Sequence, residues 1–179
     1  MRSLLLSATL LVASCAAPRD DDPLPILRAS TGDLVGSTQG VTAFAFHPRA
    51  RIVRPMEGRT DRELREAADT ALAAVLKEKG YDRVEAGSGA LTFAYAVGVS
   101  GALKDEELME LFGLSAGVDS KEGDRAGLVL ALVDLESGRL LWRGSASGPW
   151  ERELRPATEV GTEIRAAFET LLADLPRRW

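Results

Sequence analysis

Apolar residues along the chain follow the two spacings that distinguish strands from helices. In Leu91–Val99, large and small side chains alternate with period two, which predicts a strand. Val41–His47 shows a similar alternation, and we expect Pro48 to end that strand because proline cannot donate to a sheet ladder. Leu128–Asp134 is almost wholly apolar, which is typical of a strand covered on both faces. The chain therefore carries at least three strand patterns.

A turn follows the third strand pattern. Glu136–Arg139 combines polar residues with a glycine, and Leu140–Gly144 then resumes an apolar pattern. Because the connection is short, we expect Leu128–Asp134 and Leu140–Gly144 to form an antiparallel hairpin.

Two longer segments show helical spacing. Thr60 and Glu63 have the spacing of a capping box, which predicts a helix start, and Gly80 is a plausible residue just beyond its end. A second helix is predicted over roughly Ala157–Leu175, with Pro176 ending it. Each helix carries one apolar stripe. The stripe of the first helix comprises Leu64, Ala68, Ala71, Leu72, Val75 and Leu76.

The order of these elements predicts the fold class. We expect an α+β domain, a two-layer α/β sandwich whose mixed sheet of about four strands is covered by two main helices on one face. The domain would occupy 41–179, with an insertion at about 100–126. Leu103, Leu108, Met109, Leu111 and Phe112 make a short apolar helix in this insertion. It would cover the second sheet face, formed by Ala94, Ala96, Val129 and Ala131. The alternative is that Leu108, Met109, Leu111 and Phe112 form a lid or a partner-docking surface.

The N-terminus is typical of an export signal. Met1–Ser3 carries one cationic side chain, and the apolar run that follows ends at Ala13, far short of the roughly 20 residues that span a bilayer. Val12–Cys15 resembles a lipobox, so 1–14 would be a lipoprotein signal peptide, and Cys15 would carry lipid such as palmitate. The alternative is an ordinary signal peptide followed by Cys15 by chance.

A tether is predicted between the anchor and the domain. Residues 15–40 hold three prolines and the acidic run Asp20–Asp22 without a clear apolar period. Leu24, Ile26 and Leu27 could instead dock on the domain.

Composition and the scarcity of reactive side chains limit the functions available. The net charge of −5 argues against a nucleic-acid partner. His47 is the only histidine and Cys15 the only cysteine, which is too few for an ordinary zinc site. Gly113–Gly117 matches a nucleophile-elbow pattern at Ser115, but no histidine follows it. We therefore expect no enzyme activity, no metal and no cofactor.

A cationic stretch stands out in this acidic chain. Arg49, Arg51, Arg54 and Arg59 fall close together, and guanidinium groups suit phosphate or carboxylate ligands. We take these four as candidate contacts for an anionic ligand. The alternative is a solvated loop whose arginines pair with nearby carboxylates.

Several short motifs together resemble the bacterial lipoproteins of domain-of-unknown-function family 4136, over about Val41 to Pro176. The motifs are Lys79-Gly80-Tyr81, Phe93-Ala94-Tyr95, Val133-Asp134-Leu135, Gly138, Leu141-Trp142-Arg143-Gly144 and Leu175-Pro176. The resemblance implies a lipoprotein with an α/β fold and brings no established reaction.

The functional hypothesis follows from the anchor and the missing catalytic groups. We expect a non-enzymatic binding or scaffolding module with an envelope protein as partner. Ala16 after Cys15 resembles outer-membrane sorting, so we expect an outer-membrane anchor with the domain facing the periplasm; the alternative is display on the cell surface. The alternative is a carrier of a lipid or other apolar ligand.

Overall fold

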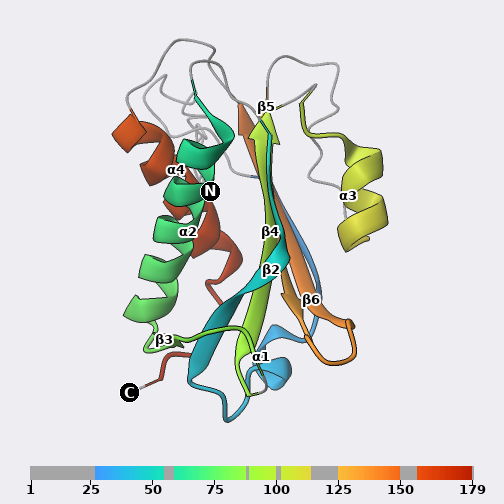
Figure 1. Cartoon of the computed structure of the whole chain (residues 1–179), viewed down its shortest axis with the longest axis vertical. Coiled ribbons are helices and arrows are strands. Elements are labelled where there is room, and N and C mark those ends of the chain that lie inside the picture. The colour runs from blue at the N-terminus through green and yellow to red at the C-terminus, as the bar shows by residue number, and fades with distance from the viewer. Residues whose placement is uncertain are drawn as a thin grey trace, which may run out of the picture.

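A six-stranded mixed sheet forms the centre of the fold (Figure 1). The computed structural model describes residues 27–54, 59–87, 89–99, 102–113, 125–149 and 157–178. The strand order is β1-β6-β5-β4-β2-β3. The strands are β1 (Leu27–Gly32), β2 (Ala43–Val53), β3 (Asp82–Arg83), β4 (Leu91–Val99), β5 (Arg125–Val133) and β6 (Leu140–Pro149). The helices are α1 (Leu34–Ser37), α2 (Asp61–Glu78), α3 (Asp105–Phe112) and α4 (Ala157–Leu171). The predicted signal peptide, Cys15 and Ser115 lie outside the described residues.

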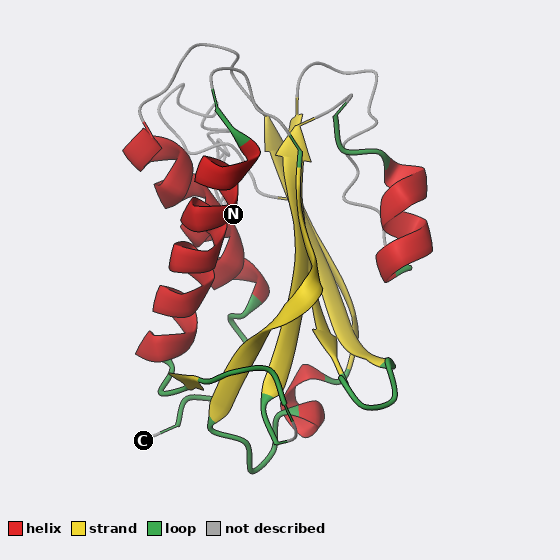
Figure 2. Cartoon of the chain, viewed as in Figure 1, coloured by secondary structure: helices red, strands yellow, loops and turns green. Residues whose placement is uncertain are grey.

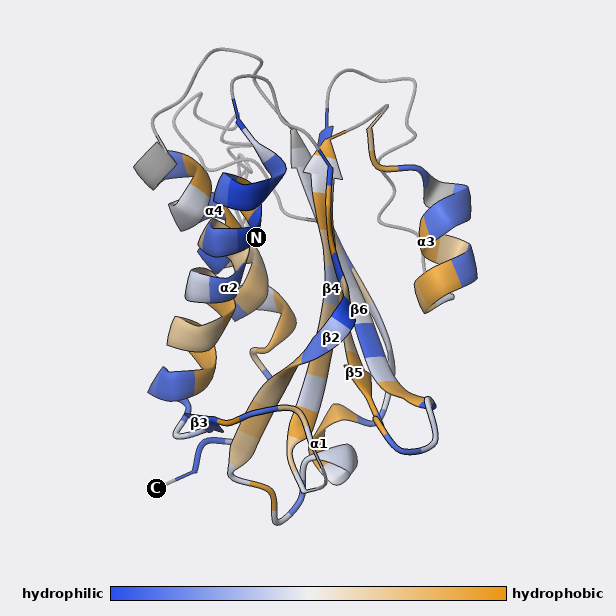
Figure 3. Cartoon of the chain, viewed as in Figure 1, coloured by the Kyte–Doolittle hydropathy of each residue, from blue (hydrophilic) through white to orange (hydrophobic). Residues whose placement is uncertain are grey.

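Both faces of the sheet are covered, and helices lie on both sides of it (Figures 1 and 2). Alternate residues of β4 point to opposite faces, and eight of its nine residues are buried. Phe93 and Tyr95 belong to the core cluster that includes the stripes of α2 and α4. Ala94 and Ala96 belong to a second cluster with α3. In Figure 3 the last turn of α3 is coloured as hydrophobic and its first turn as hydrophilic.

The predicted local structures are present with their expected ends. The Thr60 side chain accepts from the Glu63 backbone N–H and the Glu63 carboxylate accepts from that of Thr60, so the capping box is confirmed. All six stripe residues of α2 are buried. β5 and β6 pair antiparallel, which confirms the hairpin. Its turn is held by the Asp134 carboxylate, which accepts from the Glu136 N–H at 3.0 Å. β2 and β4 pair in parallel, and α2 lies between them in the sequence.

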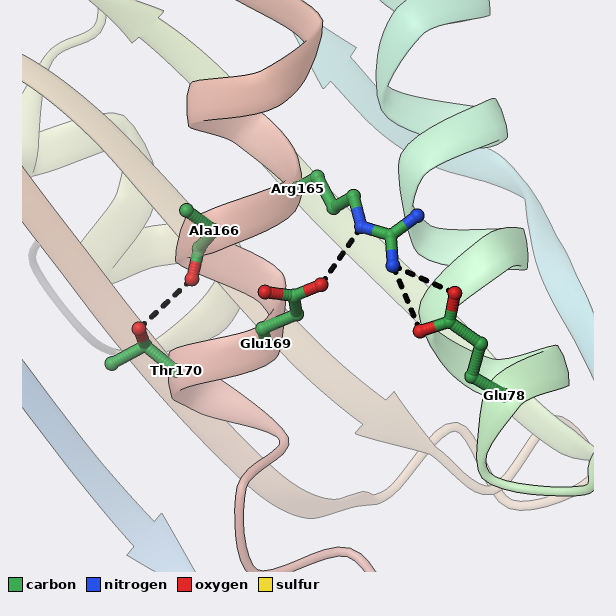
Figure 4. A network of polar contacts seen from close by, with 5 residues as sticks. All are labelled: Glu78, Arg165, Ala166, Glu169 and Thr170. Atoms are coloured by element: carbon green, nitrogen blue, oxygen red, sulfur yellow. Dashed lines mark hydrogen bonds and ion pairs between the residues drawn. The ribbon is translucent and has the colours of Figure 1, made fainter.

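An ion-pair network joins the outer surfaces of the two main helices (Figure 4). Arg165 of α4 donates to both carboxylate oxygens of Glu78 on α2, at 2.7 and 2.8 Å, and to Glu169 at 2.8 Å. These hydrogen bonds raise the pKa of Arg165. The network lies at the surface and fixes the two helices side by side.

The prediction of about four strands is wrong, because the sheet has six, although the α+β class holds. β1 lies inside the segment assigned to the tether, so that prediction is also wrong for residues 27–40. β1 pairs with β6 over six residues, from Leu27↔Ser147 to Gly32↔Trp142. Its described side chains from Arg28 on are exposed, so it has no alternating buried face that a sequence pattern could reveal. β3 has only two residues.

β2 does not end at Pro48, which corrects another expectation. The strand continues to Val53, and its register against β4 shifts between Phe46 and Arg51. Pro48 lies within this irregular stretch, where the ladder to β4 is interrupted, so its missing N–H costs no ladder hydrogen bond. His47 organises the irregularity, because its Nδ1 accepts from the backbone N–H groups of Arg49 at 3.2 Å and Ala50 at 2.9 Å.

The C-terminal segment is docked rather than frayed at Arg178. The Arg178 N–H donates to the Lys79 carbonyl at 2.7 Å, and its guanidinium donates to the Thr38 carbonyl at 2.7 Å. Tyr81 Oη donates to the Pro176 carbonyl at 3.0 Å. The chain end therefore joins the C-terminus of α2 to α1.

Gly80 is the point where this docking has no room for a side chain. Its φ is +86°, and a Cβ atom there would lie 1.7 Å from the Arg178 carbonyl oxygen. We expect Gly80→Ala to lower the free energy of unfolding by about 2–4 kcal/mol, because it adds displacement of the C-terminus to backbone strain. Gly138→Ala is the matched control, with φ +68° and nothing within 4 Å of the added Cβ. It should cost only about 1–2 kcal/mol. Urea unfolding measures both, and equal losses would contradict the docking role.

Candidate binding surfaces

The four candidate arginines do not form one cluster on one face. Arg51 pairs with Tyr95 in register and points to the α2 and α4 side, where its Nη1 binds Asp69 of α2 at 2.7 Å. Arg54 forms an ion pair with Glu107 of α3, which covers the opposite face. Arg49 is exposed in the irregular stretch of β2, and Arg59 lies just before α2. Arg51 and Arg54 at least are thus paired with carboxylates, as the alternative interpretation expects.

Arg51 belongs to a partly buried polar network. Asp69 accepts from Tyr95 Oη at 2.7 Å through one oxygen and from Arg51 through the other. Burial first, and then the Asp69 carboxylate, raise the pKa of Tyr95 far above its ordinary value. Arg51 Nε is buried and has no hydrogen-bond partner among the residues that the structure describes. Asp69 therefore fixes Arg51 and Tyr95 in place under α2.

A recess of about 440 Å³ opens beside Arg51. Its lining residues are Phe46, Arg51, Arg83, Val84, Glu85 and Ala86. The guanidinium carbon of Arg83 lies 4.6 Å from the centre of the Phe46 ring, and that of Arg51 lies 5.7 Å from it. Both distances are within the range of cation–π contacts. The volume is within the roughly 300–1,000 Å³ that is usual for ligand sites.

Arg83 is the functional candidate that the sequence pattern missed. Unlike Arg51 and Arg54, it forms no ion pair among the described residues, and Glu85 is the one acid in the lining of the recess. Only the parallel pairing of β2 with β3 brings it here, through the register Phe44↔Arg83. No motif around Arg83 marks this position.

The outer edge of β2 beside this recess is protected against pairing with another strand. β3 pairs only with Ala43 and Phe44, and no other described strand lies along that edge. Pro48, the register shift and the exposed Arg49 are features that discourage edge-to-edge pairing. A partner at this edge is therefore expected to bind through side chains.

α3 covers the second sheet face, as the sequence indicates. Leu108 and Phe112 are buried against Ala94, Ala96, Val129 and Ala131. Arg143 Nη1 donates to the Phe112 carbonyl at 2.9 Å, and the Arg54–Glu107 pair adds a second link to the sheet. The helix is thereby held in one orientation.

The four candidate partner or lid residues of α3 divide into two groups. Leu108 and Phe112 belong to the core, whereas Met109 and Leu111 are 53% and 50% exposed. Residues two apart on a helix project about 200° apart, so Met109 and Leu111 flank the buried stripe on opposite sides. They do not make one continuous apolar patch. Met109 instead neighbours the exposed acid Glu106, at a spacing of three, and Glu106 neighbours the exposed acid Glu110, at a spacing of four.

A second recess, of about 310 Å³, lies between β1, α1 and the end of α4. Charged groups of Arg28, Asp33 and Asp174 line it together with Trp142 and Leu171. Arg28 already donates to the Thr170 carbonyl at 3.1 Å. Both recesses thus carry charged rims, which suits polar ligands better than the apolar ligand of a carrier.

The described residues hold no candidate metal site. No group of three or more His, Cys, Asp and Glu side chains there could hold a metal ion. His47 is occupied by the backbone of its own strand.

No helix in the described ranges is long and apolar enough to cross a bilayer.

Known proteins resemble this chain in fold, but no family is identified for it. No protein-family model and no curated protein matches the chain. The chain is similar to a solved PelC dodecamer from Paraburkholderia phytofirmans, with a TM-score of 0.50 and 14% identity, over 87% of this chain and 100% of that one. A PDZ domain protein from Parabacteroides distasonis ATCC 8503 has a TM-score of 0.48 and 14% identity, over 82% of this chain and 35% of that one. Identities this low describe the α+β fold alone. The resemblance to family 4136 stays a prediction.

The irregular stretch of β2 should respond to pH through His47. Partial burial, and then the charge of Arg49, lower the pKa of His47 below 6.5. The folded state therefore favours neutral His47, so its contribution to stability is complete above pH 6.5 and is lost as the pH falls through the lower, folded-state pKa. We expect the wild type to lose more free energy of unfolding than His47→Gln between pH 7.5 and 5.0. Urea unfolding at the two pH values measures this, and equal losses would remove the role of His47.

Proposed function

We propose that this protein is an envelope lipoprotein, anchored through Cys15 in the outer membrane, whose domain is a non-enzymatic binding or scaffolding module facing the periplasm. The lipobox-like Val12–Cys15 supports the anchor. Residues 16–26 separate Cys15 from β1, the first element that the structure describes. Fully extended, they span at most about 40 Å. The domain would thus work close to the membrane surface.

The observation that carries the binding function is the unneutralised Arg83 over Phe46. Arg51 has Asp69 and Arg54 has Glu107, whereas Arg83 has no carboxylate partner among the residues that the structure describes. An arginine held against an aromatic ring in a recess is pre-organised, so little conformational entropy is lost when it binds a carboxylate. We propose that the recess receives an acidic surface of a protein partner. The charged rims of both recesses make the apolar-ligand carrier the weaker alternative.

A scaffolding role through self-assembly is a related proposal. The PelC protein with a similar fold is described as a dodecamer. An α+β domain of this shape can therefore be built into a large symmetric assembly, which is compatible with a scaffolding function for this chain.

Substitution of Cys15 tests the anchor. Cys15→Ser removes the thiol that would be acylated, so we expect the full chain to lose its lipid and to leave the membrane fraction. Fractionation of cells and mass spectrometry of the N-terminal peptide measure both effects. A variant that is processed and membrane-bound like the wild type would contradict the proposed anchor.

Substitution of Arg83 tests the binding surface. In native membranes, chemical cross-linking of the tagged full chain should recover a defined complex. Arg83→Ala should reduce its yield about tenfold, since removing a charged contact costs roughly 1–3 kcal/mol. Arg62→Ala is the matched control, because Arg62 is an exposed arginine on α2. Equal yields from both variants would reject the recess as the binding surface.

A further inference from the structure

Building on the proposed binding function, we infer that a second copy of this chain binds in the recess lined by Phe46, Arg51 and residues 83–86, which we call the Phe46 recess. The part of the second copy that enters the recess is the acidic ridge of its α3. We define this ridge as Glu106, Met109 and Glu110. All three side chains are exposed. Glu106 is the neighbour of both others on the helix surface, at spacings of three and four, and Met109 borders the buried stripe of Leu108 and Phe112.

The charges of the ridge and the recess are complementary. Glu107, another acid of α3, is already paired with Arg54 of its own chain. Glu106 and Glu110 form no ion pair among the described residues, and neither does Arg83. The ridge thus presents two free carboxylates, and the recess presents the free guanidinium of Arg83 with the Glu85 carboxylate in the same lining. Pairing them in an interface satisfies groups that each chain by itself leaves to solvent.

The apolar parts of the two surfaces also match. Met109 is 53% exposed on the ridge, and Val84 is 43% exposed in the lining of the recess, next to Phe46. Methionine is flexible and makes favourable contacts with aromatic rings. Burying Met109 against Val84 and Phe46 would remove two of the exposed large apolar side chains from water.

A single chain cannot make this contact with itself. Phe46 belongs to the core cluster with α2, and Arg51 binds Asp69 of α2, whereas α3 packs in the second cluster. Figure 1 shows α2 and α3 on opposite sides of the sheet. The ridge and the recess are different surfaces, so their contact is head-to-tail. Such contacts join copies into a closed ring when the rotation between neighbours closes, and into a filament when it does not.

Anchoring to the membrane compensates for the small buried area of this interface. One ridge of a short helix in one recess buries less than the roughly 1,200–2,000 Å² of a standard stable interface. Anchoring every copy to one membrane raises the local concentration of the two surfaces. Self-association is therefore expected in membranes and only weakly for chains released from them.

Site-specific cross-linking in native membranes tests the inference. Two differently tagged full-length copies are expressed together, one with a photo-crosslinking amino acid in place of Met109. We expect a cross-linked product that contains both tags, with the linked peptide of the second copy including Phe46 or residues 81–86. The same amino acid in place of Val35, exposed on α1, is the control and should give no such product.

Charge reversal makes the test specific. Arg83→Glu in the second copy should lower the yield at least tenfold, as should Glu106→Arg with Glu110→Arg in the first. Combining both changes, one in each copy, should restore at least half of the yield, whereas Glu66→Arg on the outer surface of α2 should change nothing. Arg83→Gln, with thermal melts of every variant, separates lost binding from misfolding.

The outcomes separate this inference from the function on which it rests. A cross-link from position 109 to a different protein only, or to lipid only, overturns the second copy as partner. If the Arg83-dependent complex is still recovered in that case, the binding function stands. A two-tag product that is indifferent to Arg83→Glu overturns the role of the recess. If no recovered complex depends on Arg83, both the inference and the proposed binding function are overturned.

Discussion

The need to cover both faces of β4 and β5 determines most of this structure. Eight residues of β4 and seven of β5 are buried, so neither strand has a face that tolerates water. α2 and α4 cover one face. The opposite face carries Ala94, Ala96 and Ala131, whose small side chains let a helix approach closely, and α3 lies there. Because Leu108 and Phe112 must point inward, the ridge of α3 must point outward.

The same arrangement determines which arginines are paired with carboxylates. Arg51 lies in β2 and Arg54 directly follows its last residue, Val53. Arg51 pairs with Asp69 of α2 on one side of the sheet, and Arg54 pairs with Glu107 of α3 on the other. Arg83 lies on the short edge strand β3, where no helix supplies a carboxylate. The Phe46 ring holds it instead. An acidic chain thus keeps an available guanidinium beside an apolar floor, which is the physical basis of the proposed binding site.

Rigidity gives both proposed surfaces their value. α3 is tied to the sheet by Arg143 and Arg54, and Arg51 is tied to α2 by Asp69. Binding at either surface would order few additional groups, so a small contact area would lose less affinity to conformational entropy. Together with the proposed anchor, which would confine the copies to one membrane, this permits an assembly that is held by weak and repeated contacts.

The sequence by itself determined the elements whose residues record their own burial. A helix or strand with one buried side has apolar residues at a characteristic spacing in the sequence. For this reason the sequence predicts the capping box at Thr60, the stripe of α2, the alternation in β4, the hairpin and the inward side of α3. Only the tertiary structure decided β1, β3, the continuation of β2 past Pro48 and the place of Arg83. β1 has exposed side chains and is held by backbone hydrogen bonds to β6, which leave no pattern in side-chain type. Arg83 meets Phe46 only because β2 and β3 pair in parallel, and no local spacing carries that register.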